Sequence, residues 1–154
     1  MSLWDIFKRG GPSISGPVVN AQEFGAMVAL AGLPRTAIPD DDLYRPIEIA
    51  TFWQIMTYVT AHHNFLPYRT GLADCDKRAR LVLDLGQERY AELAWSAEPY
   101  ATWAAGIVHL KRRGAKRTHK LIFNMGPGGV LTLYEDLAFK PVTLDVEKYL
   151  ATYY

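Results

Sequence analysis

The only cysteine of this 154-residue chain, Cys75, stands where a loop rich in glycine and proline gives way to a helical pattern. Asp74 precedes it as a plausible N-cap, so we expect the thiol in the first turn of a helix. The positive end of the helix dipole favours a thiolate there, and a thiolate is the nucleophilic form of cysteine. The same residue also suits a small buried side chain in the core. Cys75 is therefore a candidate nucleophile with a structural alternative.

A histidine and a carboxylate are expected to meet on a hairpin further along the chain. We interpret residues 125–129 as a five-residue hairpin loop. Counting back along both strands then puts Leu121 opposite Leu133, and His119 opposite Glu135. Opposed residues share a face of the sheet and can touch. A carboxylate bonded to one imidazole nitrogen fixes the tautomer and leaves the other nitrogen free as a base.

The composition is that of one globular domain, with 49% hydrophobic and 21% charged residues. We divide it into an N-terminal arm, residues 1–19, and a single α+β domain, residues 20–154. A single cysteine excludes an internal disulfide framework and a cysteine-based zinc site, so a cytoplasmic location is expected. The net charge of +1 gives no global attraction to nucleic acid, and no apolar run approaches the roughly 20 residues that cross a membrane. We therefore expect no nucleic-acid or membrane partner.

Three helices are expected in the first part of the chain. A capping box at residues 20–23 begins the first, which spans about three turns. Residues 33–46 are interpreted as a long loop, and the second helix follows it and ends near residue 63. The third helix begins at Cys75 and is interrupted at Gly86.

The pattern changes to strands from Trp103 onward. They are expected over residues 103–110, 119–124 and 130–135. Helices first and a sheet last favour the α+β class, with N-terminal helices followed by an antiparallel sheet.

With these residues in this order, the chain resembles the papain-like cysteine proteases, in particular the C-terminal protease domain of mushroom chimerolectins and related small phage or bacterial domains. The resemblance covers roughly residues 43–143 and rests on short motifs. These are Asp74-Cys75-Asp76 opening a helix, Ala105-Gly106-Ile107 in a strand, His119 heading the next strand, Asn124, Glu135 and Phe139-Lys140-Pro141. The resemblance implies a papain-like α+β fold with Cys75 as nucleophile, His119 as general base and acid, and Glu135 as the residue that orients His119.

The function that this resemblance implies is that of a thiol hydrolase, a cysteine peptidase that attacks a peptide or protein substrate through an acyl-enzyme. Acyl transfer to an amine and amidase action on cell-wall peptide use the same three roles and stay open. No cofactor is expected, and no metal, because Asp40-Asp41-Asp42 does not reproduce a calcium loop. The alternative is a non-catalytic interaction or accessory protein, phage-encoded for example, that binds a protein partner through the Leu3–Phe7 arm or through a basic run at residues 111–117.

Other prominent side chains are given structural interpretations. The basic run at residues 111–117 is expected to be a solvated hairpin tip, because no aromatic residues interleave its charges. His62-His63 is expected at the surface near a helix end. Trp53, Trp95 and Trp103 are expected in the core.

Overall fold

The computed structural model describes residues 14–35, 39–72, 74–135, 140–143 and 145–154. The expected Leu3–Phe7 arm lies outside these residues, and so does Phe139 of the motifs above.

The three expected helices are present. Helix α2 (Ala21–Leu30) begins where the Asn20 side chain accepts a hydrogen bond of 2.8 Å from the backbone N–H of Glu23. Helix α3 (Ile49–His62) follows, and α4 (Cys75–Leu93) is the longest. The Asp74 side chain caps α4 in the same way, by accepting from the backbone N–H of Lys77. An N-cap side chain satisfies an amide that the helix itself leaves without a partner, so these two caps fix where α2 and α4 begin.

The strands form two sheets. The larger sheet is antiparallel throughout, with the order β7-β6-β5-β4-β8. Its strands are β4 (Ala105–Arg112), β5 (Thr118–Met125), β6 (Leu131–Glu135), β7 (Lys140–Val142) and β8 (Val146–Tyr153), with a short 3-10 turn, η1 (Pro127–Gly129), between β5 and β6. The smaller sheet joins β1 (Val19–Asn20), β2 (Leu43–Arg45) and β3 (Thr102–Trp103). Three helices that precede an antiparallel sheet confirm the α+β class.

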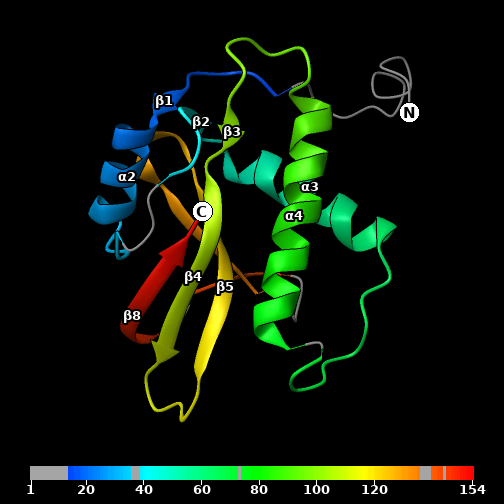
Figure 1. The fold of residues 1–154 in the computed structure, drawn as a ribbon, viewed down its shortest axis with the longest axis vertical. Coiled ribbons are helices and arrows are strands. Elements are labelled where there is room, and N and C mark those ends of the chain that lie inside the picture. Colours follow the sequence, from blue (N-terminus) through cyan, green and yellow to red (C-terminus); the bar gives the residue numbers. More distant parts are fainter. Residues whose placement is uncertain (1–13, 36–38, 73, 136–139, 144) are drawn as a thin grey trace.

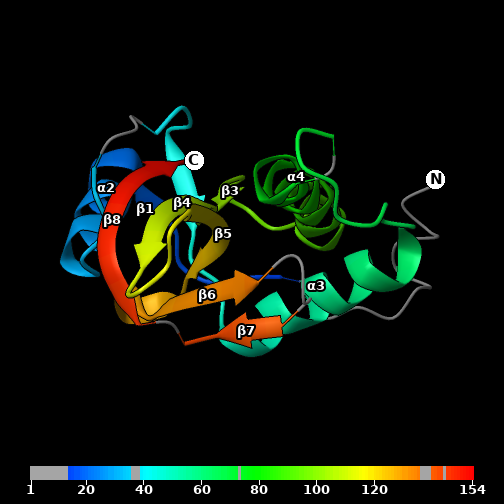
Figure 2. The ribbon, with the colours of Figure 1, turned by 90° about the horizontal axis from the view of Figure 1, so that it is seen from below.

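The large sheet lies between α2 on one side and the pair α3 and α4 on the other (Figures 1 and 2). Alternate residues of its strands point to opposite faces, so each face builds its own core. Ile107 and Ile122 pack with α3 and α4, whereas Val108 and Leu121 pack with α2. The sheet is thus the layer that both cores share.

Three expectations about elements are wrong. Helix α4 continues through Gly86. The glycine serves packing and does not end the helix, because a Cβ at Gly86 would lie 2.9 Å from the Trp103 ring. Part of the expected 33–46 loop is strand β2, which pairs with β1 and β3. Strand β8 was not expected, although it pairs with β4 along most of its length.

Two of the three tryptophans are not core residues. Trp103 is fully buried, whereas the exposed fractions of Trp53 and Trp95 are 43% and 57%. A helical or loop position can leave one face of a large ring in water, and the sequence pattern does not distinguish this from full burial.

The hairpin between β5 and β6 has a register that differs by two residues from the expected one. Leu133 pairs with Phe123 instead of Leu121, because the loop spans residues 126–130 instead of 125–129. Side chains alternate between faces with a period of two, so this shift keeps every residue on its expected face. His119 and Glu135 therefore still share a face, as diagonal and not directly opposed neighbours.

Candidate functional site

An open cleft lies between the start of α4 and the hairpin formed by β4 and β5. Its volume is about 580 Å³. The residues that line it are Tyr68, Cys75, Arg112, Ala115, Lys116, Arg117, Thr118 and His119. Two of the three residues that the sequence singled out for chemistry, Cys75 and His119, thus border one cavity.

The cap of α4 sets the position of Cys75. Cys75 is the first residue of the helix and is half-buried. The Asp74 side chain accepts hydrogen bonds from the backbone N–H groups of Gly71, at 2.9 Å, and Lys77, at 3.4 Å. These bonds lower the pKa of the Asp74 carboxyl, first through Gly71 and then through Lys77. The thiol consequently stands at the positive end of a capped helix, as expected.

An ion pair joins the start of α4 to the start of β5. Lys120 Nζ donates to Asp76 Oδ1 at 2.6 Å. This bond is the main cause of the lowered pKa of the Asp76 carboxyl. Asp76 follows Cys75 and Lys120 follows His119, so the pair holds the segments that carry the thiol and the imidazole beside each other.

His119 is bonded to Glu135. His119 Nε2 lies 2.8 Å from Glu135 Oε2, and their side chains are only 11% and 13% exposed. A carboxylate can only accept, so Nε2 carries the hydrogen of this bond, and Nδ1 is the ring nitrogen that can accept a proton. The expected contact between these two side chains is therefore present, while their roles in any reaction stay a prediction.

The thiol and the imidazole border the same cleft without bonding to each other. Within the described part of the chain, no hydrogen bond joins Cys75 to His119. Contacts between a nucleophile and its base are often long without a ligand and shorten when one is bound.

Positive charge gathers on the side of the cleft that the β4–β5 hairpin forms. Arg112, Lys116 and Arg117 all line the cleft and are exposed. The sequence placed these residues at a solvated hairpin tip, which is correct as far as exposure goes. Their position at the rim of a cleft was not predicted, since it depends on how the hairpin lies against α4.

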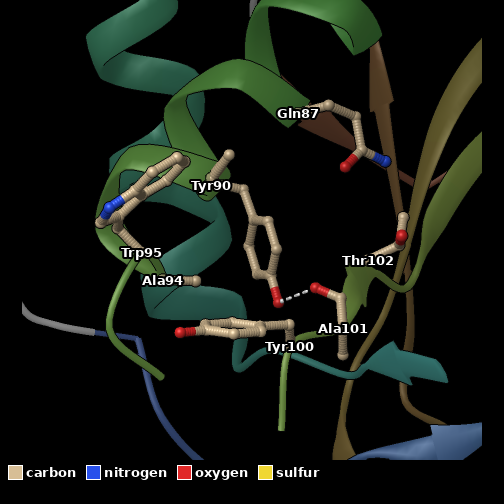
Figure 3. A pocket seen from close by; sticks show the side chains of 8 residues that line it. Gln87, Tyr90, Ala94, Trp95, Tyr100, Ala101 and Thr102 are labelled. Atoms are coloured by element: carbon tan, nitrogen blue, oxygen red, sulfur yellow. Dashed lines mark hydrogen bonds between the residues drawn. The ribbon is translucent and has the colours of Figure 1, made fainter. Parts of the chain in front are cut away.

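A second cavity, of about 520 Å³, lies at the other end of α4. Figure 3 shows the rings of Tyr90, Trp95 and Tyr100 around it, with Gln87 and Thr102 on another side. The Tyr90 hydroxyl donates to the carbonyl oxygen of Ala101 at 2.9 Å, as the dashed line marks. Burial raises the pKa of Tyr90, so this hydroxyl stays protonated as a donor at neutral pH. This pocket is not predicted by the sequence, because the pattern around Trp95 indicates a core position.

Comparison with known proteins finds the same fold in solved structures. No protein-family model matches the chain, and no curated protein matches it. One solved structure is described as the PSL1a–E64 complex, with 16% sequence identity and a TM-score of 0.61. Another is the Polyporus squamosus lectin bound to the human-type influenza-binding epitope Neu5Acα2-6Galβ1-4GlcNAc, with 16% identity and a TM-score of 0.66. Each match covers 88% of this chain and 49% of the other, so the chain spans about half the length of these structures. At this identity the likeness shows the fold alone.

These comparisons correct the expected family. The matching structures are described as a lectin and its complexes, and neither description names a protease. The assignment to the papain-like cysteine proteases is therefore wrong, and so are the thiol hydrolase activity, the peptide or protein substrate and the phage connection that were taken from it.

The physical reason is that the motifs behind that assignment also have packing roles. A Cβ at Gly106 would lie 2.3 Å from the carbonyl oxygen of Tyr153, so β8 requires glycine in the Ala105-Gly106-Ile107 motif. Asn124 Oδ1 accepts a hydrogen bond of 2.8 Å from the indole N–H of Trp103 in the core. Short motifs with such structural duties do not define a family.

Among the described residues, no helix is long and apolar enough to cross a membrane. In the same residues, no cluster of three or more histidine, cysteine, aspartate or glutamate side chains is arranged to hold a metal ion.

Proposed function

We propose that the cleft beside Cys75 is a ligand site with a reactive thiol, in which Cys75 is the nucleophile, His119 the base and Glu135 the residue that positions His119. The observation that carries this proposal is that the thiol at the capped start of α4 borders the same cavity as an imidazole bonded to a buried carboxylate. Structural cysteines have no need of such a neighbour.

The chemistry follows from the tautomer of His119. Nδ1 accepts the thiol proton of Cys75, and Glu135 stabilises the imidazolium that forms through the bond to Nε2. The thiolate then forms a bond from Sγ to an electrophilic carbon of the ligand, and the leaving atom departs with the electron pair of its bond. The proton stays on His119 or passes to the leaving atom. This chemistry needs no peptide substrate.

Within the α+β class, we also propose that the fold is papain-like. A helix that starts with the thiol, set against an antiparallel sheet that carries the imidazole, is papain-like in architecture. The helix-to-sheet ion pair between Asp76 and Lys120 supports this description.

Alkylation of Cys75 tests the proposal. At pH 7, the rate at which iodoacetamide modifies Cys75 should be at least about tenfold higher in the native chain than in the His119→Ala variant, since a positioned base contributes at least that much. His62→Ala is the matched control, because His62 lies on the exposed end of α3 and bonds to Tyr58. A thiol that reacts equally in all three proteins, or only after unfolding, would rule the proposal out.

A second probe is E64, the compound in the PSL1a–E64 complex. E64, an epoxide, should add once to Cys75: Sγ bonds to an epoxide carbon, the C–O bond opens, and His119 returns its proton to the oxygen. The expected result in intact-protein mass spectrometry is one adduct in the wild type and none in Cys75→Ser. Modification at any other residue would contradict the assignment of the site.

Carbohydrate binding is a second candidate function, favoured by the lectin neighbours and by the aromatic pocket. Exposed aromatic rings stack on the apolar faces of sugars, while amide and hydroxyl groups bond to sugar hydroxyls. Trp95 and Tyr100 are 57% and 68% exposed, and Gln87 and Thr102 supply polar groups in the same pocket.

The trisaccharide Neu5Acα2-6Galβ1-4GlcNAc is the probe for this candidate. Calorimetric titration should detect binding to the wild type, and Trp95→Ala and Tyr100→Ala should weaken it roughly tenfold each. Leu30→Ala is the control, because Leu30 is 88% exposed on the remote helix α2. Binding that survives both aromatic variants would exclude this pocket as the sugar site.

A further inference from the structure

The cations on the cleft wall have no partners in the described part of the chain. Arg112, Lys116 and Arg117 form no ion pair there, although each lines the cleft. Their neighbours on the same hairpin differ: Lys111 bonds to Glu147 at 2.7 Å, and Arg113 to Asp145 at 3.2 Å. The hairpin thus separates its charges into a paired set, held by β8 and the segment before it, and an unpaired set that faces the cleft.

Among the described residues, the carboxylates beside Cys75 and His119 are already engaged. Asp74 caps α4, Asp76 bonds to Lys120, and Glu135 bonds to His119. None of them is available to neutralise the three cations. Although the net charge of the chain is only +1, the described residues around its one thiol thus carry a local excess of positive charge.

We infer that the ligand of the Cys75 cleft is an anion, a small molecule that carries a carboxylate or a comparable charged group next to its electrophilic carbon. This inference rests on the reactive-thiol function proposed above and names its ligand class. Arg112, Lys116 and Arg117 would bind the charged group at the rim, while the reacting carbon lies over Cys75. Unpaired cations along a cleft raise the local concentration of anions and speed their association.

A pair of reagents that differ mainly in charge provides the test. Iodoacetate and iodoacetamide both transfer a methylene carbon to Sγ and release iodide, but only iodoacetate is an anion. The measured quantity is the ratio of their rate constants at Cys75 in the native chain. In the wild type at low salt this ratio should exceed that of Lys116→Ala/Arg117→Ala by roughly tenfold, and the difference should shrink in 0.5 M NaCl, where screening is strong.

Lys111→Ala/Arg113→Ala is the matched control. It removes two positive charges from the same hairpin, but from side chains bonded to Glu147 and Asp145 and absent from the cleft lining. Its ratio should stay close to that of the wild type. A ratio that is the same in all three proteins, or that falls equally in both variants, would overturn the inference and leave the reactive thiol intact. Failure of both reagents would instead count against the proposed function.

A measurement on a variant without the thiol tests anion binding separately from the reactivity of Cys75. In Cys75→Ala, titration with succinate followed by amide NMR should shift the signals of Ala115 and Thr118, which line the cleft. Succinamide, its uncharged analogue, should shift them little, and Lys116→Ala/Arg117→Ala should abolish the succinate effect. Equal shifts with both compounds, or no shift with either, would overturn the assignment of an anionic ligand even if Cys75 proves reactive.

Discussion

Glu135 is the residue whose charge matters most to the proposed chemistry, because it accepts the hydrogen bond from His119 Nε2 at 2.8 Å. Glu135→Gln keeps the size of the side chain but removes the negative charge that stabilises an imidazolium. We expect the rate of Cys75 alkylation at pH 7 to fall by about tenfold or more, since replacing the orienting carboxylate beside a histidine base is costly. Iodoacetamide kinetics followed by mass spectrometry measure this rate.

The control for that variant is Glu92→Gln. Glu92 accepts a hydrogen bond from a basic side chain, Arg89, at 2.8 Å, but it lies near the end of α4 away from the cleft. Its alkylation rate should match the wild type. If Glu135→Gln reacts as fast as Glu92→Gln, then Glu135 has a packing role only.

The sequence indicates individual candidate residues of the site but not all of their neighbours. Cys75 and Glu135 were found from residue type, a helix cap and strand counting, which are local signals. The cations at the cleft rim were seen in the sequence and assigned to solvent, since only the tertiary arrangement shows that three of them border a cavity. Trp95 was misassigned for the same reason.

Gly86 lies where α4 packs closely against α3 and Trp103. A Cβ there would lie 2.8 Å from Met56 Cε and 2.9 Å from Trp103 Cζ3. Gly86→Ala should therefore lower the free energy of unfolding by about 1–3 kcal/mol, because overpacking outweighs the roughly 1 kcal/mol gained from helix propensity. Urea unfolding followed by circular dichroism measures the change.

Gly25→Ala in α2 is the matched substitution. The nearest atoms to the added Cβ belong to the guanidinium end of Arg35, at 3.0 Å, and a long flexible side chain can move aside. We expect this variant to be as stable as the wild type, or more stable by up to about 1 kcal/mol. If both alanines change stability by the same amount, helix propensity alone explains the result and close packing at Gly86 does not.

The ion pair between Asp76 and Lys120 fastens α4 to β5, and its contribution should depend on pH. The hydrogen bond from Lys120 holds the pKa of the Asp76 carboxyl below its ordinary value of 3.8. A carboxyl with a lowered pKa contributes stability that is fully present above the ordinary value and is lost as the pH falls through the lower one. Because Asp76 is 44% exposed, solvent screening limits this contribution to about 1 kcal/mol or less.

Asp76→Asn should accordingly be less stable than the wild type by up to about 1 kcal/mol at pH 7. The difference should begin to shrink as the pH falls below 3.8, and it should approach zero once the pH passes below the lowered pKa, where the folded wild-type carboxyl becomes neutral too. Denaturant titrations at both pH values give the comparison, with Asp145→Asn as the control for an exposed pair. A difference that persists undiminished in acid would mean that Asp76 acts through shape and not through charge.

Helices and local pairings could be predicted here, whereas long-range pairings could not. The start of α4 follows from Asp74, a signal contained in a few neighbouring residues. Strand β8 pairs with β4, some 40 residues earlier in the chain, and nothing near Val146–Tyr153 indicates that partner. The β5–β6 hairpin lies between these cases. Its faces are as expected because side chains alternate, and its register differs by two residues because the five-residue loop begins one residue later than expected.

The whole molecule is organised around a sheet that two cores share. Phe24 of α2 stacks on Tyr44 on one side, with ring centroids 4.4 Å apart. Phe52 of α3 meets Tyr134 edge-on on the other side, at 5.7 Å. Both phenylalanines are fully buried, and strands β4 and β5 contribute residues to both clusters. Neither helical layer can therefore lose its contacts without exposing a face of the same strands.

We expect Phe24→Ala and Phe52→Ala each to cost about 3–5 kcal/mol, and each to unfold in a single transition. The described tryptophans, Trp53, Trp95 and Trp103, belong to α3 or to the chain that follows α4. The buried one, Trp103, packs in the core of the α3 and α4 layer and not in that of Phe24, so its fluorescence reports on the other layer. Because the sheet couples the layers, Phe24→Ala should shift the fluorescence midpoint in urea as far as it shifts the midpoint by circular dichroism. Leu30→Ala, at an exposed position of α2, should change the free energy of unfolding by less than about 0.5 kcal/mol with either signal. A fluorescence midpoint that stays in place while the circular dichroism signal is lost earlier would show that α2 and its core unfold as a separate unit.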